Sequence, residues 1–270
     1  MPVAPKNIAR YDYPLLAVSK PMDLKNRVAL VTGASRGLGA AIARALAGHG
    51  AKVAVNYFAS EKPAQHLVAD IARTGGVARA FAADVRDEQQ IDGLVRDVAR
   101  AFGPIDILVI NATGPQPMLR IEELTWRACL DQLEFFVKSP MLLVRAVLAE
   151  MKQRKYGRII QIGSEVFESG LSPFSNYVSA KGAQLGLTRA WAMELGPWGI
   201  TVNTVSPGWI PTERHADIPP EPKQQYASQV PLGRMGVPAD VAEAVAFLAS
   251  DAANFITGQK IAVNGGNTLE

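Results

Sequence analysis

The sequence has 270 residues, of which 48% are hydrophobic and 20% are charged, and its formal net charge is +3. This composition is typical of a globular protein with a sizeable core, and the scattered basic residues give little support to nucleic-acid binding. No run reaches the roughly 18 apolar residues of a membrane span. The only cysteine, Cys129, excludes an internal disulfide and a cysteine-built metal site. We therefore expect no metal, no nucleic-acid partner, no membrane segment and a reducing cytoplasmic location.

Residues 1–23 differ from the rest of the chain, because their one apolar patch at 15–18 is too short for the core of a signal peptide. We expect an N-terminal arm there. It is either disordered or packed through Tyr11, Tyr13 and Leu15 onto its own domain or a neighbouring subunit. No linker or repeat divides the remainder, which predicts one domain over 24–270.

From Arg27 onward, short β-branched segments alternate with longer amphipathic segments. This rhythm predicts an α/β fold, a doubly wound parallel sheet of about seven strands with helices on both faces. We predict strands at 28–32, 51–57, 77–82, 105–110, 158–163, 200–205 and 259–264. We predict helices at 40–49, 59–74, 87–102, 122–155, 176–195 and 238–250. Pro140 is expected to kink the fourth helix, and the proline-rich residues 207–236 predict an irregular insert.

A glycine-rich turn joins the first predicted strand to the first predicted helix. Glycines let a pyrophosphate approach the backbone closely, and the free amides at a helix start attract negative charge. The alternative is a purely structural turn. In the first strand-turn-helix of an alternating fold, the turn predicts a dinucleotide site. Its expected members are Gly33, Ser35, Arg36, Gly37, Leu38 and Gly39.

The choice between the two nicotinamide cofactors is predicted from charge. An acidic residue near the end of the second strand would bind a ribose 2′-hydroxyl, but that strand ends at Asn56, and Arg36 lies in the turn. A 2′-phosphate would therefore meet a guanidinium, which favours NADP(H) unless Arg36 points into water. Asp84 and Val85 follow the third strand, where an adenine would lie. Asp84 either accepts a hydrogen bond from the base or caps the next helix.

Tyr177 and Lys181 stand four residues apart in a predicted helix, so both side chains project from one face. A fixed cation lowers the pKa of a phenol, which is ordinarily about 10, toward a range where it exchanges protons. Ser164 follows the fifth strand, and its hydroxyl is suited to bind the same reacting oxygen. The alternative is a chance spacing, with the tyrosine half-buried and the lysine in water.

Over residues 25–267 the chain resembles the short-chain dehydrogenase/reductase family, a Rossmann-type fold. The matching stretches are 32–39, Asn111 with Ala112, Ser164, Tyr177 with Lys181, 206–212, and 256–259 with 264–266. The resemblance implies that Tyr177 is the general acid/base and that Ser164 orients the substrate oxygen. It implies that Lys181 holds the nicotinamide ribose and lowers the tyrosine pKa. It also implies that Asn111, Pro207, Gly208, Ile210 and Thr212 line the nicotinamide site, while the cofactor carries the redox step.

The chain departs from the family pattern at two places. Phe136 stands where the family usually has an asparagine that contributes to a proton relay, and a phenyl ring makes no such hydrogen bond. The relay is then in doubt unless Gln132 or Ser139 takes over. Thr113 stands where glycine is usual and places a β-branched side chain beside the cofactor.

These features predict an NADPH-dependent reductase that converts a carbonyl, of a ketone or 3-oxoacyl compound, to an alcohol. One alternative is an NAD-linked alcohol, polyol or sugar dehydrogenase; Phe136 suggests another, a non-catalytic NADP-binding protein. The chain resembles reductases of carrier-protein thioesters. Arg154 with Lys155 would either meet an acidic carrier or form a solvated helix end. The segment 209–231 suggests a substrate lid. The resemblance implies a homo-oligomer, commonly a tetramer, joined through the two long helices and the C-terminal strand region.

Overall fold

The computed structural model describes residues 22–269, so the predicted arm at 1–23 lies almost wholly outside the described residues. Within them, seven strands form one sheet in the order β3-β2-β1-β4-β5-β6-β7. All neighbouring strands are parallel, which confirms the predicted fold class. The strands are β1 (Val28–Val31), β2 (Lys52–Tyr57), β3 (Val77–Ala82), β4 (Ile107–Ile110), β5 (Gly157–Ile162), β6 (Ile200–Pro207) and β7 (Lys260–Val263).

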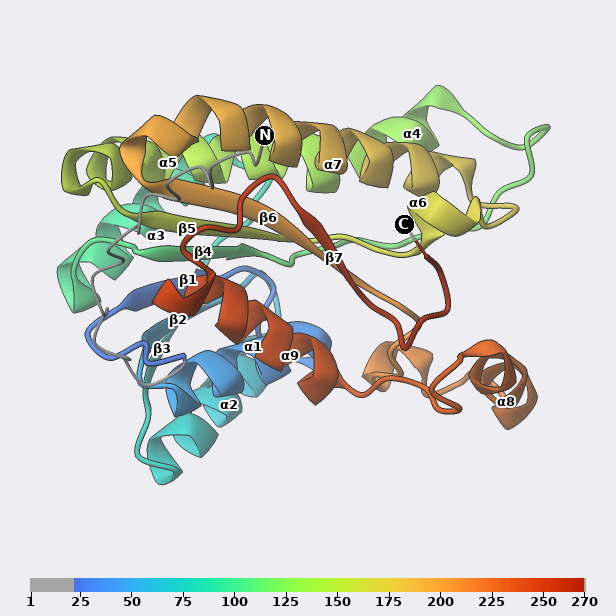
Figure 1. Cartoon of the computed structure of the whole chain (residues 1–270), viewed down its shortest axis with the longest axis horizontal. Coiled ribbons are helices and arrows are strands. Elements are labelled where there is room, and N and C mark those ends of the chain that lie inside the picture. The colour runs from blue at the N-terminus through green and yellow to red at the C-terminus, as the bar shows by residue number, and fades with distance from the viewer. Residues whose placement is uncertain (1–21, 270) are drawn as a thin grey trace, which may run out of the picture.

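Helices cover both faces of the sheet (Figure 1). The two layers follow from β1, whose side chains alternate between the faces. Ala29 and Val31 pack on the side of α1 (Gly37–Gly48), α2 (Glu61–Arg73) and α9 (Pro238–Ala249). Val28 and Leu30 pack on the side of α3 (Glu88–Phe102), α5 (Ser139–Arg154) and α7 (Ser175–Leu195). Because both faces are covered, every residue of β1 is buried, which explains its continuous apolar sequence.

The strand order reverses between β1 and β4, because the chain builds outward from β1 through β2 to β3 and then returns to place β4 on the other side of β1. The loops that leave the carboxyl ends of two such strands diverge and leave a crevice. Thr32 joins the two ends, since its amide donates to Val109 O at 3.0 Å and its hydroxyl accepts from the Asn111 amide at 2.9 Å. This crevice is where the predicted site residues gather.

The predicted long helix at 122–155 is interrupted. It begins later, as α4 (Trp126–Leu133), because the Thr125 side chain caps it by accepting from the Ala128 amide. A π-helical turn, η1 (Glu134–Lys138), then leads into α5. Pro140 explains the widened turn, because a proline lacks the N–H that would bond to the carbonyl four residues earlier and its ring collides with that carbonyl. That carbonyl belongs to Phe136, which lies within the π-helical turn.

The insert between β6 and α9 contains a helix, α8 (Pro220–Gln229), so the prediction of an irregular segment is wrong there. Prolines at positions 220 and 222 fall in the first turn of α8, where the missing N–H has no intrahelical partner to lose. The smaller elements are the short helix α6 (Val166–Ser169) and the 3-10 turns η2 (Gly196–Trp198), η3 (Glu213–His215) and η4 (Asp251–Ala253). None of the helices over 22–269 is long and apolar enough to cross a membrane.

Candidate active site

The glycine-rich turn after β1 has a geometry that side chains would prevent. Gly33 has φ +60°, and a Cβ there would lie 2.8 Å from the Ala112 Cα. A Cβ on Gly39 would lie 2.5 Å from the Asn111 side-chain nitrogen. Helix α1 starts at Gly37 with no capping side chain and no acidic residue in its first turn. Its first-turn amides therefore suit a pyrophosphate, and the residues of the turn fit a dinucleotide.

Asn56 supports this turn from below. It is 1% exposed, its side-chain oxygen Oδ1 accepts from the Gly33 backbone amide at 3.2 Å, and its side-chain nitrogen donates to Ala83 O at 3.2 Å. Its side-chain amide thus bonds to backbone groups of the turn and of the segment after β3, and the place of Asn56 among the cofactor-binding residues stays a prediction. Arg36 is exposed at the N-cap of α1, whereas Ser35 and Leu38 are half-buried.

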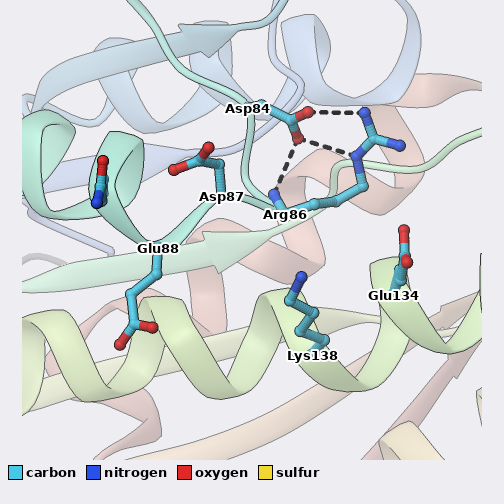
Figure 2. Close-up of a pocket in the computed structure, with 7 residues that line it drawn as sticks. Asp84, Arg86, Asp87, Glu88, Glu134 and Lys138 are labelled. Atoms are coloured by element: carbon cyan, nitrogen blue, oxygen red, sulfur yellow. Dashed lines mark hydrogen bonds and ion pairs between the residues drawn. The ribbon is translucent and has the colours of Figure 1, made fainter.

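Asp84 borders an open cleft of about 640 Å³ between the end of β3 and η1, shown in Figure 2. Its carboxylate accepts from the Arg86 Nε at 3.0 Å and Nη2 at 2.6 Å, and this hydrogen-bonded pair lowers the pKa of Asp84. The N-cap of α3 is Asp87, which accepts from the Gln90 amide. The capping alternative for Asp84 is therefore wrong, because the N-cap of α3 lies three residues later. Val85 is buried in the core.

Asn111 joins the carboxyl end of β4 to the glycine-rich turn. Its side-chain nitrogen donates to Thr32 O at 2.9 Å and to Gly33 O at 3.2 Å. Asn111 therefore fixes the width of the crevice between β1 and β4. Beyond it, the Thr113 hydroxyl is exposed and accepts from the Gln116 side chain at 2.8 Å.

The segment after β6 crosses toward the same turn. The Gly208 amide donates to Val263 O at 3.1 Å, which pins the segment to β7 just after Pro207. Ile210 is buried. Thr212 comes close to the turn, since its Cβ would lie 3.6 Å from a Cβ on Gly37. The segment and the turn therefore face each other across the crevice.

Ser164 and Tyr177 meet at the carboxyl end of β5. Tyr177 lies in the first turn of α7, and its ring stacks on Phe174 with centroids 4.7 Å apart. Burial raises the pKa of Tyr177 to about 12, although polar contact with Ser164, the charge of Arg214 and polar contact with Gln116 oppose that rise. Lys181 does not contribute to this balance, so the predicted lowering of the tyrosine pKa by Lys181 is not what the structure has.

Lys181 is 5% exposed, and its ammonium donates to Ile162 O at 2.7 Å and to Gln184 Oε1 at 3.0 Å. Burial lowers the pKa of Lys181 well below its ordinary value. The alternative of a solvated lysine is therefore wrong. The ammonium also lies 3.8 Å from the centroid of the Phe136 ring and 5.5 Å from that of Tyr177.

Neither residue that the sequence offered in place of the missing asparagine contacts Lys181. Gln132 donates to Pro115 O at 2.9 Å, and Ser139 is buried in the first turn of α5. The polar side chain beside the ammonium is Gln184, one helical turn beyond it on the same face of α7. That spacing of three residues was visible in the sequence.

Three further residues, which no sequence motif indicated, lie around the catalytic group. Gln116 and Arg214 come from the loops after β4 and β6, and both lower the pKa of Tyr177. Glu165 directly follows Ser164, is buried, and accepts from the Tyr226 hydroxyl of α8 at 2.5 Å. No local motif marks these residues, because only the folded sheet brings their loops together.

At the opposite end of β4, Arg154 forms an ion pair with the buried Asp106 and donates to Ile105 O at 2.7 Å. The charge of Arg154 is therefore paired within the domain. This pairing argues against contact of Arg154 with an acidic carrier and against a fully solvated helix end. Among the described residues, no cluster of three or more His, Cys, Asp or Glu side chains is suited to hold a metal ion.

Comparison with known proteins assigns this arrangement to a family. The family model described as enoyl-(acyl carrier protein) reductase matches residues 33–268, a range that contains the glycine-rich turn, Ser164, Tyr177 and Lys181. The chain belongs to the short-chain dehydrogenase/reductase family. The same family membership explains why all these groups lie at the carboxyl edge of one parallel sheet.

Named members of the short-chain dehydrogenase/reductase family are similar over nearly their whole length. The chain is 40% identical to 3-oxoacyl-[acyl-carrier-protein] reductase FabG of Staphylococcus aureus, over 88% of this chain and 96% of the relative. It is 41% identical to FabG of Vibrio cholerae, over 91% of this chain and 98% of the relative. A crystal structure of a putative gluconate dehydrogenase from Agrobacterium tumefaciens superposes with a TM-score of 0.87 at 32% identity, covering 93% of this chain and all of that one. The chain is therefore an oxidoreductase that uses a nicotinamide cofactor.

Proposed function

We propose that the protein is an NADPH-dependent reductase that converts a carbonyl to an alcohol, with Tyr177 as the proton donor. The observation that carries this proposal is the convergence of Ser164, Tyr177 and Lys181 at the end of β5, across the crevice from the glycine-rich turn. Reduction of a carbonyl adds a hydride to its carbon atom and a proton to its oxygen atom. The bound nicotinamide supplies the hydride.

The protein groups handle the proton and the position of the substrate oxygen. Burial holds the pKa of Tyr177 at about 12, so its phenol carries a proton at neutral pH, and Ser164, Arg214 and Gln116 oppose the rise and so favour donation of that proton. The Ser164 hydroxyl, in polar contact with Tyr177, directs the carbonyl oxygen toward the phenol. Gln116 and Arg214 border the phenol from the loops after β4 and β6, and the charge of Arg214 favours the phenolate left after donation.

The preference for NADP(H) rests on Arg36 and on the absence of a competing carboxylate. Arg36 is exposed at the start of α1, where a guanidinium can reach a 2′-phosphate. Asn56, at the end of β2, turns its side chain inward to the backbone. A comparison of kcat/KM with NADPH and NADH tests the preference, and equal use of both cofactors would contradict it.

The substrate class that we favour is a 3-oxoacyl thioester, since the curated relatives quoted above are named as 3-oxoacyl-[acyl-carrier-protein] reductases. The second candidate is a sugar acid or polyol, supported by the superposed structure of a putative gluconate dehydrogenase. A non-catalytic role has no such support, because the chain is an oxidoreductase by family. Phe136 therefore needs a catalytic explanation.

The test is an assay of NADPH consumption with a short 3-oxoacyl thioester, simple ketones and keto sugar acids, and of NAD+ reduction with gluconate. We expect turnover of the thioester with NADPH. Turnover limited to gluconate and NAD+ would support the second candidate. If the protein binds NADPH but turns over no member of the panel, the proposed reductase activity is wrong.

We also propose a homo-oligomer, with the tetramer taken from the family resemblance. Met193 on α7 is 83% exposed and Phe255, just before β7, is 99% exposed, and large exposed apolar side chains at these two places support contacts between copies. Size-exclusion chromatography with light scattering tests this. The cytoplasm remains the predicted location, on the support of the single free thiol of Cys129.

A further inference from the structure

The ammonium of Lys181 has three partners inside the protein. Two are oxygen atoms, Ile162 O at 2.7 Å and Gln184 Oε1 at 3.0 Å. The third is the face of the Phe136 ring, whose centroid is 3.8 Å from Nζ. An ammonium with three donors is thus surrounded by two acceptors and one aromatic face, away from solvent.

Burial disfavours a charged lysine, so whatever keeps this ammonium charged must come from those partners. The titratable groups on the surrounding elements are Tyr177 on α7, Glu134 and Lys138 on η1, Glu165 after β5 and Arg214 after β6. Among the described residues, none of these groups forms an ion pair with Lys181, and burial lowers its pKa. The carbonyl of Ile162 belongs to the backbone, which leaves Gln184 and Phe136 as the two side chains that stabilise the charge.

Both residues are buried inside the protein. Gln184 is 1% exposed on α7, with its backbone oxygen accepting from Gln161 Nε2. Phe136 is 3% exposed in the π-helical turn, and its ring also meets the Tyr177 ring edge to face at 5.3 Å. Phe136 therefore contacts both the cation and the phenol and fixes their separation.

We propose that Gln184 and Phe136 are positioning residues that together hold the Lys181 ammonium beside Tyr177, the amide oxygen and the ring face replacing the polar side chain expected at position 136. The proposal rests on the reductase function proposed above. It explains how a phenylalanine occurs at this position in an oxidoreductase that retains the serine, tyrosine and lysine.

Gln184→Met is the central variant, because methionine has nearly the same length and volume but no strong acceptor. Gln161→Met is its matched control, since Gln161 is equally buried but donates to Thr188 Oγ1 at 2.7 Å and to the backbone oxygen of Gln184, and to neither Lys181 nor the Gln184 side chain. We expect the pKa of Lys181 to fall by about one unit in Gln184→Met, as estimated for a hydrogen bond to a charged group. Gln161→Met should leave it unchanged. Phe136→Leu removes the ring face from the ammonium, together with the edge contact to Tyr177, and should lower the same pKa by about half a unit.

The pKa is measured by NMR on protein with 13C-labelled lysine, with the Lys181 signal assigned by its loss in Lys181→Arg. In catalysis, the alkaline limb of kcat/KM for carbonyl reduction should move to lower pH by the same amount, because a lysine with a lower pKa loses its charge earlier. An unchanged lysine pKa in both Gln184→Met and Phe136→Leu would overturn the proposal, as would an equal shift in Gln161→Met. The titration needs no turnover: if the wild type reduces no carbonyl, the proposed function fails while the titration still decides this inference.

Discussion

The hydroxyl of Tyr226 on α8 donates a 2.5 Å hydrogen bond to the carboxylate of Glu165, the residue that directly follows Ser164. The same hydroxyl accepts from the Trp209 amide at 2.9 Å, and a Cβ on Gly208 would lie 2.4 Å from it. Asn267 donates to the second oxygen of Glu165 at 3.2 Å. One buried carboxylate therefore ties α8, the segment after β6 and the C-terminal segment to the end of β5.

Tyr226→Phe should loosen α8 without disturbing the fold, because the ring retains its contact with Trp209 at 5.6 Å. We expect the KM for the carbonyl substrate to rise by roughly tenfold, about 1.4 kcal/mol, the low end for a hydrogen bond to a charged group. Steady-state kinetics measures this. Tyr156→Phe is the control, since that hydroxyl bonds to Asp251 at the other end of β5. An equal KM in the two variants would show that α8 does not border the substrate.

Arg36→Ser should weaken the preference for NADPH. Loss of a charge-assisted bond to the 2′-phosphate should reduce kcat/KM for NADPH by about 10- to 100-fold and leave the value for NADH nearly unchanged. Arg44→Ser is the matched control, because Arg44 is exposed on the same helix and paired with Asp70 at 3.1 Å. A parallel loss with both cofactors would mean that Arg36 does not discriminate between them.

Asn56→Ala should destabilise the protein by about 1–3 kcal/mol, because it leaves the Gly33 amide and Ala83 O buried without partners. Chemical denaturation measures the free energy of unfolding. The exposed Asn254→Ala should stay within about 0.5 kcal/mol of the wild type. Because Asn56 supports the turn, the ratio of kcat/KM with NADPH to kcat/KM with NADH should change little. A large change in that ratio would contradict the supporting role of Asn56.

The pair of Asp84 and Arg86 makes stability depend on pH. In the folded state, the hydrogen bonds from Arg86 lower the pKa of Asp84 below its ordinary value of 3.8. The carboxylate therefore adds stability that is fully present above about pH 4 and is lost as the pH falls through the lowered value. Asp84→Asn should cost about 0.5–1 kcal/mol at pH 7, allowing for solvent screening, and progressively less as the pH falls below about 4. Unfolding measured between pH 7 and pH 2, with the exposed Asp92→Asn as control, tests this; a cost that does not shrink below pH 4 would contradict it.

The sheet and most of its helices were predictable because their signals are local. Every residue of β1 is apolar, and a strand buried on both faces needs just such a run. The spacing of Tyr177 and Lys181 on one helical face is likewise a local property. Helix α8 was missed because its prolines suggest an irregular segment unless their place in the first turn is known.

The environment of the catalytic group was not predictable from local pattern. Position 136 was identified from the resemblance, but its contact with Lys181 depends on the π-helical turn that Pro140 imposes. The pKa of Tyr177 was predicted to fall and instead rises, because burial is the larger effect and depends on how Phe174 and Phe136 pack around the ring. Such packing is set by elements far apart in the sequence.

Proton donation by Tyr177 is the central claim, and Tyr177→Phe tests it most directly. The variant retains the stacked ring and the edge contact with Phe136 and loses only the hydroxyl. NADPH oxidation in the presence of a carbonyl substrate should fall by about 10²- to 10⁴-fold, the usual contribution of general acid catalysis, while NADPH binding measured by fluorescence stays within a few-fold of the wild type. Carbonyl reduction by Tyr177→Phe at the wild-type rate would contradict the account.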